Sequence, residues 1–244
     1  AIQDTIKPHL IVLGGYRTKF MKKAEKFFSE FHPNAPIIIT NHQTAEMIKY
    51  ANNSFLATKI SFINQIANIC EEIPNANIDD VSKAIGLDPR IGNLFLNAGP
   101  GYGGSCLPKD VKAIINFSTK MGINPTLLTA VEKTNKQQID NILRLAEQNI
   151  GKINGKKITI LGVAFKPETD DIRDSVGIEL VKRLLKLGAK ITIHDPKALE
   201  NARKIFRDNA KYVKSIPAAL KDCQCAIIMT QWKDYETIDN KVIK

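Results

Sequence analysis

The sequence predicts a protein of mixed α and α/β class, with a helical central domain followed by an incomplete doubly wound parallel-sheet (Rossmann-like) domain. Residues 41–150 carry an almost unbroken helical periodicity of apolar side chains. Residues 157–229 instead alternate short apolar runs with amphipathic stretches. Because a strand, a helix and a second strand at this spacing form a right-handed βαβ unit, the second pattern predicts a parallel sheet.

The individual elements follow from periodicity and from residues that start or stop them. Asn77 is a typical N-cap, and Gly151 a typical helix stop. Before the central domain we expect a strand at 10–14, a helix at 18–31 and a strand at 37–39. In the central domain we expect helices at 41–73, 78–85, 110–121 and 125–150. In the sheet domain we expect strands at 157–163, 190–194 and 226–229, and helices at 175–187 and 197–206.

Three domains are therefore expected along the chain. The chain opens at Ala1, close to the first strand, and we interpret it as a fragment of a longer protein. The first domain would be the tail end of a preceding α/β domain, and the last would be truncated. Their expected bounds are residues 1–40, 41–150 and 151–244.

The longest expected helix has more apolar surface than one neighbouring layer can cover. One face holds Ile48, Ala51, Phe55, Ile63, Ile66 and Ala67, and Met47, Phe62, Ile69 and Cys70 widen it. This pattern predicts a homodimer that forms through the helix at 41–73, which makes the central domain a dimerisation domain.

Composition narrows the classes of partner. The net charge of +10 indicates an anionic partner such as a nucleotide or a diphosphate. Aromatic residues make up only 7% of the chain and are dispersed, so we expect no nucleic-acid partner. No apolar run reaches the roughly 20 residues of a membrane span, so we expect no membrane partner. The N-terminus does not resemble a signal peptide, and we expect a cytoplasmic protein.

The four cysteines suggest neither a disulfide framework nor a metal site. Cys70, Cys106, Cys223 and Cys225 do not have the spacing of a disulfide-rich domain. Cys223 and Cys225 have no second pair and no histidine nearby to complete a zinc site, so we expect no metal. For these two residues we favour plain burial.

Cys106 has a different setting. It follows a glycine-rich turn and precedes Pro108, close to the start of the helix expected from Asp110. The N-terminus of a helix and the neighbouring Lys109 both favour a thiolate, which is the nucleophilic form. The alternative is a small buried hydrophobe, but glycine on one side and Lys-Asp on the other make a poor core environment.

Three further polar residues, Lys49, Asn53 and Asp110, occupy positions that suggest a chemical role. Lys49 and Asn53 are four residues apart, so they project from one helix face and can converge on one oxygen atom. The alternative is a solvated lysine beside a surface asparagine. Asp110 could interact with the positive end of its helix and serve chemistry as well.

The run Gly-Tyr-Gly-Gly-Ser-Cys106-Leu-Pro-Lys-Asp110 resembles the catalytic-cysteine signature of the UDP-glucose/GDP-mannose dehydrogenase family, with the UDP-glucose branch the most similar. Three other segments also resemble family motifs, in family order. They are Lys49-Tyr-Ala-Asn-Asn53, Asp88-Pro-Arg90-Ile-Gly-Asn, and Ala164-Phe-Lys166-Pro-Glu-Thr-Asp-Asp-Ile-Arg173.

The resemblance implies an NAD-dependent, four-electron oxidation of UDP-glucose to UDP-glucuronate, through a thiohemiacetal and a thioester on a cysteine. The implied catalytic residues are Cys106, Lys49, Asn53 and Asp110. The implied substrate-binding residues are Arg90, which reaches the neighbouring subunit, with Tyr102, Gly103, Phe165 and Lys166. Lys109 and Arg173 are implied on the side of the NAD cofactor.

The sequence also lacks the glycine-rich turn that usually binds the NAD pyrophosphate. No Gly-x-Gly-x-x-Gly turn follows a strand, and Gly162-Val-Ala-Phe has only the first glycine. The resemblance implies that residues 1–40 are the tail end of the family's N-terminal NAD-binding domain and that residues 151–244 are its nucleotide-sugar (UDP) binding domain, truncated. The family's general-base glutamate would lie upstream of Ala1. Two alternatives therefore stay open: an enzyme for GDP-mannose or a UDP-N-acetylhexosamine, and a catalytically silent fragment that dimerises and binds nucleotides.

Overall fold

The computed structural model describes residues 5–238. The chain separates into two compact units, residues 1–53 and residues 54–244. The outer ends of the first and last expected domains, residues 1–4 and 239–244, lie outside the described residues. The domain bounds at 40 and 150 stay a prediction.

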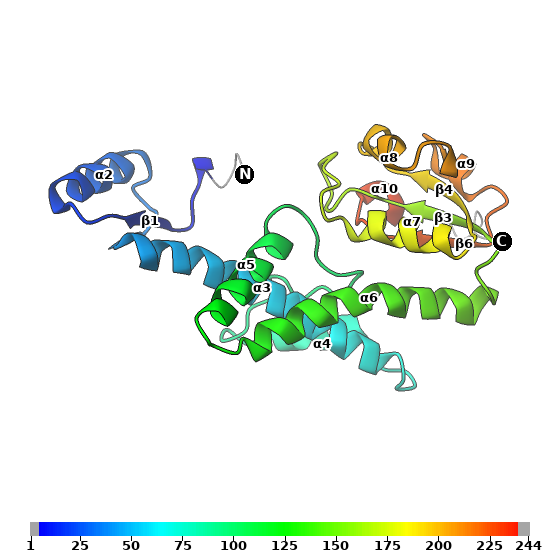
Figure 1. Ribbon diagram of the computed structural model, residues 1–244, viewed down its shortest axis with the longest axis horizontal. Coiled ribbons are helices and arrows are strands. Elements are labelled where there is room, and N and C mark those ends of the chain that lie inside the picture. The colour runs from blue at the N-terminus through cyan, green and yellow to red at the C-terminus, as the bar shows by residue number, and fades with distance from the viewer. Residues whose placement is uncertain (1–4, 239–244) are drawn as a thin grey trace. The chain divides into compact units, whose positions relative to one another are not determined.

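The first unit contains a small parallel pair of strands and the start of a long helix (Figure 1). Strands β1 (Ile11–Gly14) and β2 (Ile37–Thr40) pair in parallel and are connected by helix α2 (Thr18–Phe31). Gly14 lies so close to helix α3 (His42–Cys70) that an added Cβ would come within 2.7 Å of Ala45 Cβ. No residue of α2 is buried among the described residues, so this unit has no core of its own.

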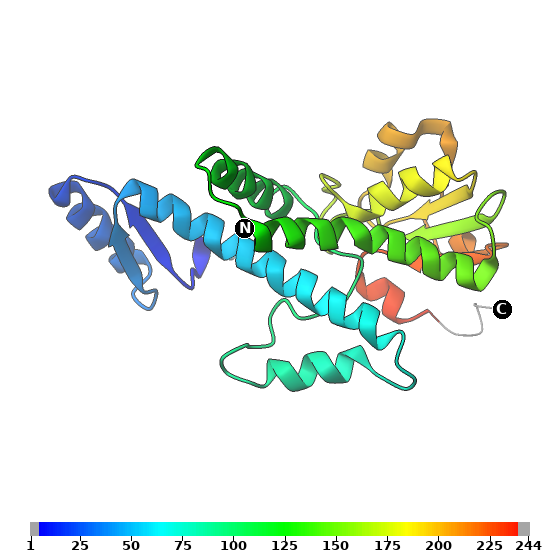
Figure 2. The same ribbon diagram turned by 60° about the horizontal axis from the view of Figure 1, so that its bottom comes forward.

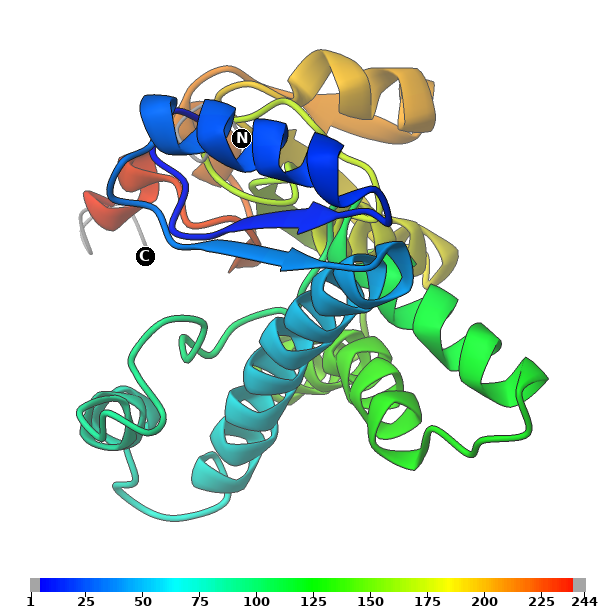
Figure 3. The same cartoon turned by 90° about the vertical axis from the view of Figure 1, so that its left-hand side faces the viewer.

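The second unit begins with four helices, as the periodicity predicts. Helix α3 continues into it, and the others are α4 (Ile78–Gly86), α5 (Leu107–Lys120) and α6 (Thr126–Ile150). Asn77 caps α4, since its Oδ1 accepts from Asp79 N at 2.8 Å. In Figures 2 and 3, α4 and α5 lie on opposite sides of α3. A small core between α3, α5 and α6 is formed by Ala57, Tyr102, Val111 and Val131.

The long helix α3 differs from the expectation in one respect. We expected Phe55 and Ile63 to share a face, but Ile63 is fully buried and Phe55 is 66% exposed. The large exposed apolar residues in this part of α3 and just beyond it are Phe55, Phe62, Ile69 and Ile73. Phe55, Phe62 and Ile69 are seven residues apart, so they form one stripe along the helix, and Ile73 lies just beyond its end. The surface available to a partner is therefore this stripe, and Ile63 is not part of it.

A four-stranded parallel sheet forms the rest of the second unit, in the order β5-β4-β3-β6. Its strands are β3 (Lys157–Leu161), β4 (Lys190–His194), β5 (Ala210–Tyr212) and β6 (Cys225–Ile228). The helices are α7 (Val176–Lys186), α8 (Leu199–Phe206), α9 (Ile216–Leu220) and α10 (Lys233–Glu236). Figure 2 shows α7 and α8 on one face of the sheet and α10 on the other. This is the doubly wound arrangement, and it confirms the predicted fold class.

The core of this sheet explains its sequence pattern. Residues 158, 160 and 161 of β3 are at most 1% exposed, and they pack with Leu180, Val181 and Leu184 of α7. A strand buried on both faces needs a nearly continuous apolar run, which is what β3 has. Strand β5 and helices α9 and α10 were missed, because three, five and four residues are too short to show a period.

No helix among residues 5–238 combines the length and the apolar character needed to cross a membrane.

Candidate active site

Cys106 lies at the N-cap position of α5, and its side chain is exposed. The sequence predicted a helix from Asp110, but the helix begins at Leu107, so the thiol is closer to the helix start than expected. The carbonyl of Cys106 accepts from Asp110 N at 2.9 Å, which closes the first turn. The hydroxyl of Ser105 lies 3.8 Å from the sulfur. An exposed thiol at the positive end of a 14-residue helix is well placed to act as a nucleophile.

The segment that leads to this thiol, residues 99–106, is called the cysteine loop below. It meets the segment after β3, residues 165–175, at very short range. Gly104 N donates to Arg173 O at 3.1 Å. A Cβ on Gly104 would come within 2.6 Å of the Phe165 ring, and one on Gly103 within 2.4 Å of Asp174 O. Both positions therefore require glycine, because a side chain would clash with the 165–175 segment. Gly104 also has a φ of +84°, which favours glycine.

Three side-chain amides hold the other end of the cysteine loop. Asn135 Oδ1 accepts from Tyr102 N at 2.8 Å, and its Nδ2 donates to Tyr102 O at 2.9 Å. Asn64 Oδ1 accepts from Gly99 N at 2.8 Å, and Gln138 Nε2 donates to Gly99 O at 3.2 Å. The sequence analysis missed all three. The only signal was the spacing of Asn135 and Gln138, which puts them on one face of α6.

Asp110 and Lys109 lie at the base of α5. The side chain of Asp110 is fully buried, and its Oδ1 lies 3.1 Å from Lys109 Nζ, whose side chain is 62% exposed. A buried carboxylate paired with a lysine fixes the first turn of α5. The pair therefore lies in the turn that carries Cys106, and most of the lysine side chain is exposed.

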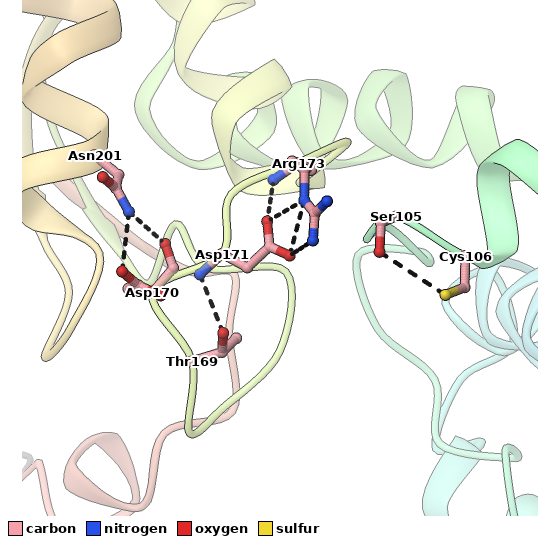
Figure 4. Close-up of polar contacts among 7 residues, drawn as sticks. All are labelled: Ser105, Cys106, Thr169, Asp170, Asp171, Arg173 and Asn201. Atoms are coloured by element: carbon pink, nitrogen blue, oxygen red, sulfur yellow. Dashed lines mark hydrogen bonds and ion pairs between the residues drawn. The ribbon is translucent and has the colours of Figure 1, made fainter. Parts of the chain in front are cut away.

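The segment after β3 carries the other predicted ligand-binding residues. Figure 4 shows Arg173 hydrogen-bonded to the carboxylate of Asp171. Arg173 Nε lies 3.0 Å from both carboxylate oxygens, and Arg173 Nη2 lies 2.7 Å from Oδ2. This ion pair lowers the pKa of Asp171 and raises that of Arg173. Phe165 faces the cysteine loop, and Lys166 Nζ lies 5.5 Å from the centre of its ring. Phe165, Arg173 and the cysteine loop are thus brought together, while the Arg173 side chain stays 70% exposed.

A buried carboxylate organises the start of this segment. Asp195, at the end of β4, accepts from Val163 N at 2.7 Å and from Ala164 N at 3.0 Å through Oδ2. Its Oδ1 accepts from Lys197 N and Ala198 N at 2.9 and 2.7 Å. The sequence suggested only a turn at this point. The turn after β3 therefore cannot cradle a pyrophosphate, since its amide donors are already used.

Nor is there room for a phosphate at Gly162, in the same turn. A Cβ on Gly162 would meet Thr230 at 2.5 Å. Among the described residues, the other strand-to-helix turn with glycines is Gly14-Gly15 between β1 and α2, and it lacks the Gly-x-Gly-x-x-Gly spacing. The residues present thus do not fit a complete NAD site, although Lys109 and Arg173 remain positively charged groups near the cysteine loop.

Tyr102 is both a core residue and part of the wall of a cleft. Its ring is buried, with 6% exposed, and its main chain is held by Asn135. Burial, and to a lesser degree Glu132, raise the pKa of Tyr102 to about 12, so the phenol stays protonated at neutral pH. Tyr102 also lines a cleft of about 650 Å³ between α5, α6 and α7, which Lys112, Glu132 and Lys182 border. Cys106 is not among the residues that line this cleft.

Arg90 lies in the loop after α4, and its side chain is 87% exposed. Arg90 Nη2 is 2.6 Å from Asp88 Oδ2, and Arg90 Nε is 3.0 Å from Asp88 Oδ1. Lys59 of α3 steadies the loop by donating to the carbonyls of Ile91 and Gly92, both at 3.1 Å. No hydrogen bond or ion pair of residues 5–238 joins Arg90 to the cysteine loop. One edge of its guanidinium is paired with Asp88, while most of the side chain is exposed to solvent.

Lys49 and Asn53 belong to the first unit and lie on α3. Lys49 is exposed, with Nζ 5.7 Å from the centre of the Tyr50 ring, and Asn53 is half-buried. Their spacing of four residues in a continuous helix puts them on one face, as predicted.

Metal ligands are not gathered anywhere in the described part of the chain, since no group of three or more His, Cys, Asp or Glu side chains could hold an ion. Cys223 and Cys225 are both half-buried, and burial raises the pKa of Cys225.

Comparison with known proteins gives the family. Residues 43–137 match the central domain of the UDP-glucose/GDP-mannose dehydrogenase family, and residues 159–244 match its UDP binding domain. UDP-glucose 6-dehydrogenase TuaD of Bacillus subtilis is 40% identical over 244 residues, which is all of this chain and 52% of that protein. The UDP-glucose 6-dehydrogenase of Rickettsia felis is 41% identical over 98% of this chain and 54% of its own length.

A solved structure of the same family is also similar to this chain. A UDP-glucose dehydrogenase from Pyrobaculum islandicum superposes with a TM-score of 0.91 and 37% identity, over 98% of this chain and 55% of that one. The chain spans about half the length of the curated relatives it matches. With two domains of one family matched in order, this chain belongs to the UDP-glucose/GDP-mannose dehydrogenase family.

Proposed function

We propose that this chain supplies the catalytic and nucleotide-sugar-binding parts of an NAD-dependent UDP-glucose 6-dehydrogenase. The observation that carries the proposal is an exposed Cys106 at the start of α5, on a loop that bonds directly to the 165–175 segment through Gly104 N and Arg173 O. The UDP-glucose 6-dehydrogenases among the relatives support the choice of substrate.

The role of Cys106 is covalent catalysis. In the proposed reaction the C6 alcohol of the sugar becomes an aldehyde, and the thiolate of Cys106 adds to its carbonyl carbon. A C–S bond forms and the oxygen takes a proton, which gives a thiohemiacetal. Oxidation of this adduct gives a thioester, and water cleaves its C–S bond to release the carboxylate and the thiol. Overall, one alcohol, one water and two NAD⁺ give one carboxylate, two NADH and three protons.

The polar partners of this chemistry are the predicted ones. Lys49 and Asn53 would donate hydrogen bonds to the C6 oxygen and stabilise negative charge on it. Asp110 would assist water, or hold the turn of Cys106, and its burial beside Lys109 supports the second task. We propose that NAD is held mainly by a part of the protein outside this chain, with Lys109 and Arg173 at the edge of its site.

The substrate-binding residues are proposed from the same loops. Phe165, Lys166, Tyr102 and Gly103 lie on the cysteine loop or on the segment after β3, where ligands of parallel sheets bind. Arg90 would bind the diphosphate in the site of a second subunit, and its 87% exposure supports a role outside its own fold.

We also propose a homodimer through α3. The stripe of Phe55, Phe62 and Ile69, together with Ile73, is about half exposed or more, which is unusual for a monomer surface. A stable interface buries about 800 Å² per partner, and a helix of 29 residues is long enough to provide it.

The direct test is a chimera, in which the part of the Bacillus subtilis relative outside the match is fused to this chain. We expect NADH formation with UDP-glucose, and at least about tenfold lower kcat/KM with GDP-mannose or UDP-N-acetylglucosamine. A preference for either of the other two would replace the proposed substrate. A folded chimera that forms no NADH with any of the three would refute a catalytic role.

A further inference from the structure

We propose that Asn135 is a positioning residue for Cys106, acting by pairing with both main-chain polar groups of Tyr102 in the cysteine loop. This inference rests on the proposed function for its catalytic meaning, but its structural part is independent of activity.

The cysteine loop has almost no backbone hydrogen bonds of its own. Within the described residues, the main chain of 99–103 makes no backbone–backbone hydrogen bond, and the first one in the loop is Gly104 N to Arg173 O. Buried main-chain groups need partners, and here the partners are the amides of Asn64, Asn135 and Gln138. These three side chains therefore replace a strand neighbour.

Asn135 makes the strongest of these contacts. Its Oδ1 accepts from Tyr102 N at 2.8 Å and its Nδ2 donates to Tyr102 O at 2.9 Å, so one amide satisfies both groups of one residue. Only a primary amide offers a donor and an acceptor in this geometry. Gly101 is shaped to the same contact, since its φ is +111° and a Cβ would come within 2.6 Å of Asn135 Oδ1.

The contact between Asn135 and Tyr102 lies close to the Cys106 thiol along the chain. Three residues lie between Tyr102 and Cys106, and two of them are glycines in close contact with Asp174 and Phe165. Beyond the thiol, Asp110 N to Cys106 O starts α5. Cys106 is therefore held between α5 on one side and the Asn135 contact on the other.

The experiment is Asn135→Asp in the 244-residue chain. The change keeps the acceptor for Tyr102 N but sets a carboxylate oxygen against Tyr102 O, which removes one hydrogen bond and adds repulsion. We expect amide hydrogen exchange in residues 99–106 to accelerate by about tenfold, with the amides of α5 and α6 unchanged. Alkylation of Cys106 by iodoacetamide at pH 7 should slow at least about threefold, because the thiol is no longer held at the helix start.

Two controls separate positioning from general loosening. Asn149→Asp makes the same chemical change on the same helix, where the amide bonds only to Leu145 O, and it should change neither readout. In Asn135→Asp the ratio of the loop's exchange rate to that of the unsubstituted chain should fall towards one as the pH is lowered through the pKa of the new carboxyl, about 3.9 in a model peptide, since a protonated carboxyl can donate again.

Gln138→Glu serves as the second variant, and it decides the matter if Asn135→Asp does not fold. It keeps the acceptor used by Asn68 and Asn141 and loses only the donation to Gly99 O, so the same local change should appear in smaller degree. In the chimera, Asn135→Asp should lower kcat by about tenfold, with a smaller rise in KM because Tyr102 also belongs to the proposed substrate site.

Unchanged exchange in residues 99–106, or a rise spread equally over α5 and α6, would overturn the positioning role even if the chimera is active. An inactive parent chimera would instead count against the proposed function and leave the exchange result standing.

Discussion

Cys106 and Asn135 show what the sequence can and cannot reveal about single residues. Cys106 was predicted because its neighbours are informative: glycine before it, proline and a helix start after it. Asn135 was not predicted, because its partner Tyr102 is 33 residues away and nothing local marks the pair. Asp195 was missed for the same reason, since it bonds to residues more than 30 positions away. Local signals predict candidate reactive groups, whereas side chains that hold a loop through tertiary contacts leave no local signal.

The exposed position of Cys106 gives a first prediction. Cys106 is exposed, while Cys70, Cys223 and Cys225 are half-buried, and burial raises the pKa of Cys225. With limiting iodoacetamide at neutral pH, mass mapping should therefore find Cys106 alkylated first. Faster modification of Cys223 would show that the helix start does not activate the thiol.

Gly104 gives a second prediction at this scale. Gly104→Ala combines a φ of +84° with a Cβ 2.6 Å from the Phe165 ring, and should lower the free energy of unfolding by about 1–3 kcal/mol. Gly99→Ala is the matched control, since a Cβ there meets nothing within 4 Å and the amide remains. Urea denaturation compares the two variants, and equal losses would mean that the approach of Phe165 costs nothing.

At the scale of elements, the long periodic segments were predicted well. Helices α2, α3 and α6 and strands β3 and β4 lie within a few residues of their predicted bounds. Periodicity could not say which stripe of α3 faces the core, since Phe55 and Ile63 are equally apolar but only Ile63 is buried. That choice depends on where α5 and α6 pack.

The exposed stripe of α3 gives a third prediction. Replacing Phe62 and Ile69 together by Asp should convert a dimer into monomers, because two charges would be buried at the seam. Sedimentation at micromolar concentration measures the change, with the exposed Phe20→Asp on α2 as a control that should stay dimeric. If the unsubstituted chain is itself a monomer, the interface does not exist, and Arg90 then has no second subunit to reach.

At the scale of the molecule, His194 links pH to stability. It is 4% exposed, and its Nδ1 lies 2.9 Å from Tyr235 Oη. Burial lowers the pKa of His194, although a hydrogen bond with the Lys214 backbone and the charges of Asp195 and Asp234 oppose the shift. The folded imidazole therefore stays neutral where the unfolded one, with a pKa of about 6.5, takes up a proton.

The consequence is a fourth prediction. The stabilisation is complete above the unfolded pKa and is lost as the pH falls below it, so the melting temperature should drop between about pH 7.5 and about pH 5.5. In His194→Gln this drop should be smaller, because nothing titrates at that position. An equally steep drop in the variant would assign the pH dependence to other groups.

The most direct measurement of the central claim is NADH yield per UDP-glucose in the chimera, with Cys106→Ala beside it. We predict two NADH for each UDP-glucose consumed, and a loss of more than about a hundredfold in this activity in Cys106→Ala, with Cys70→Ala as the unaffected control. An undiminished yield of two NADH from the Cys106→Ala chimera would contradict the account.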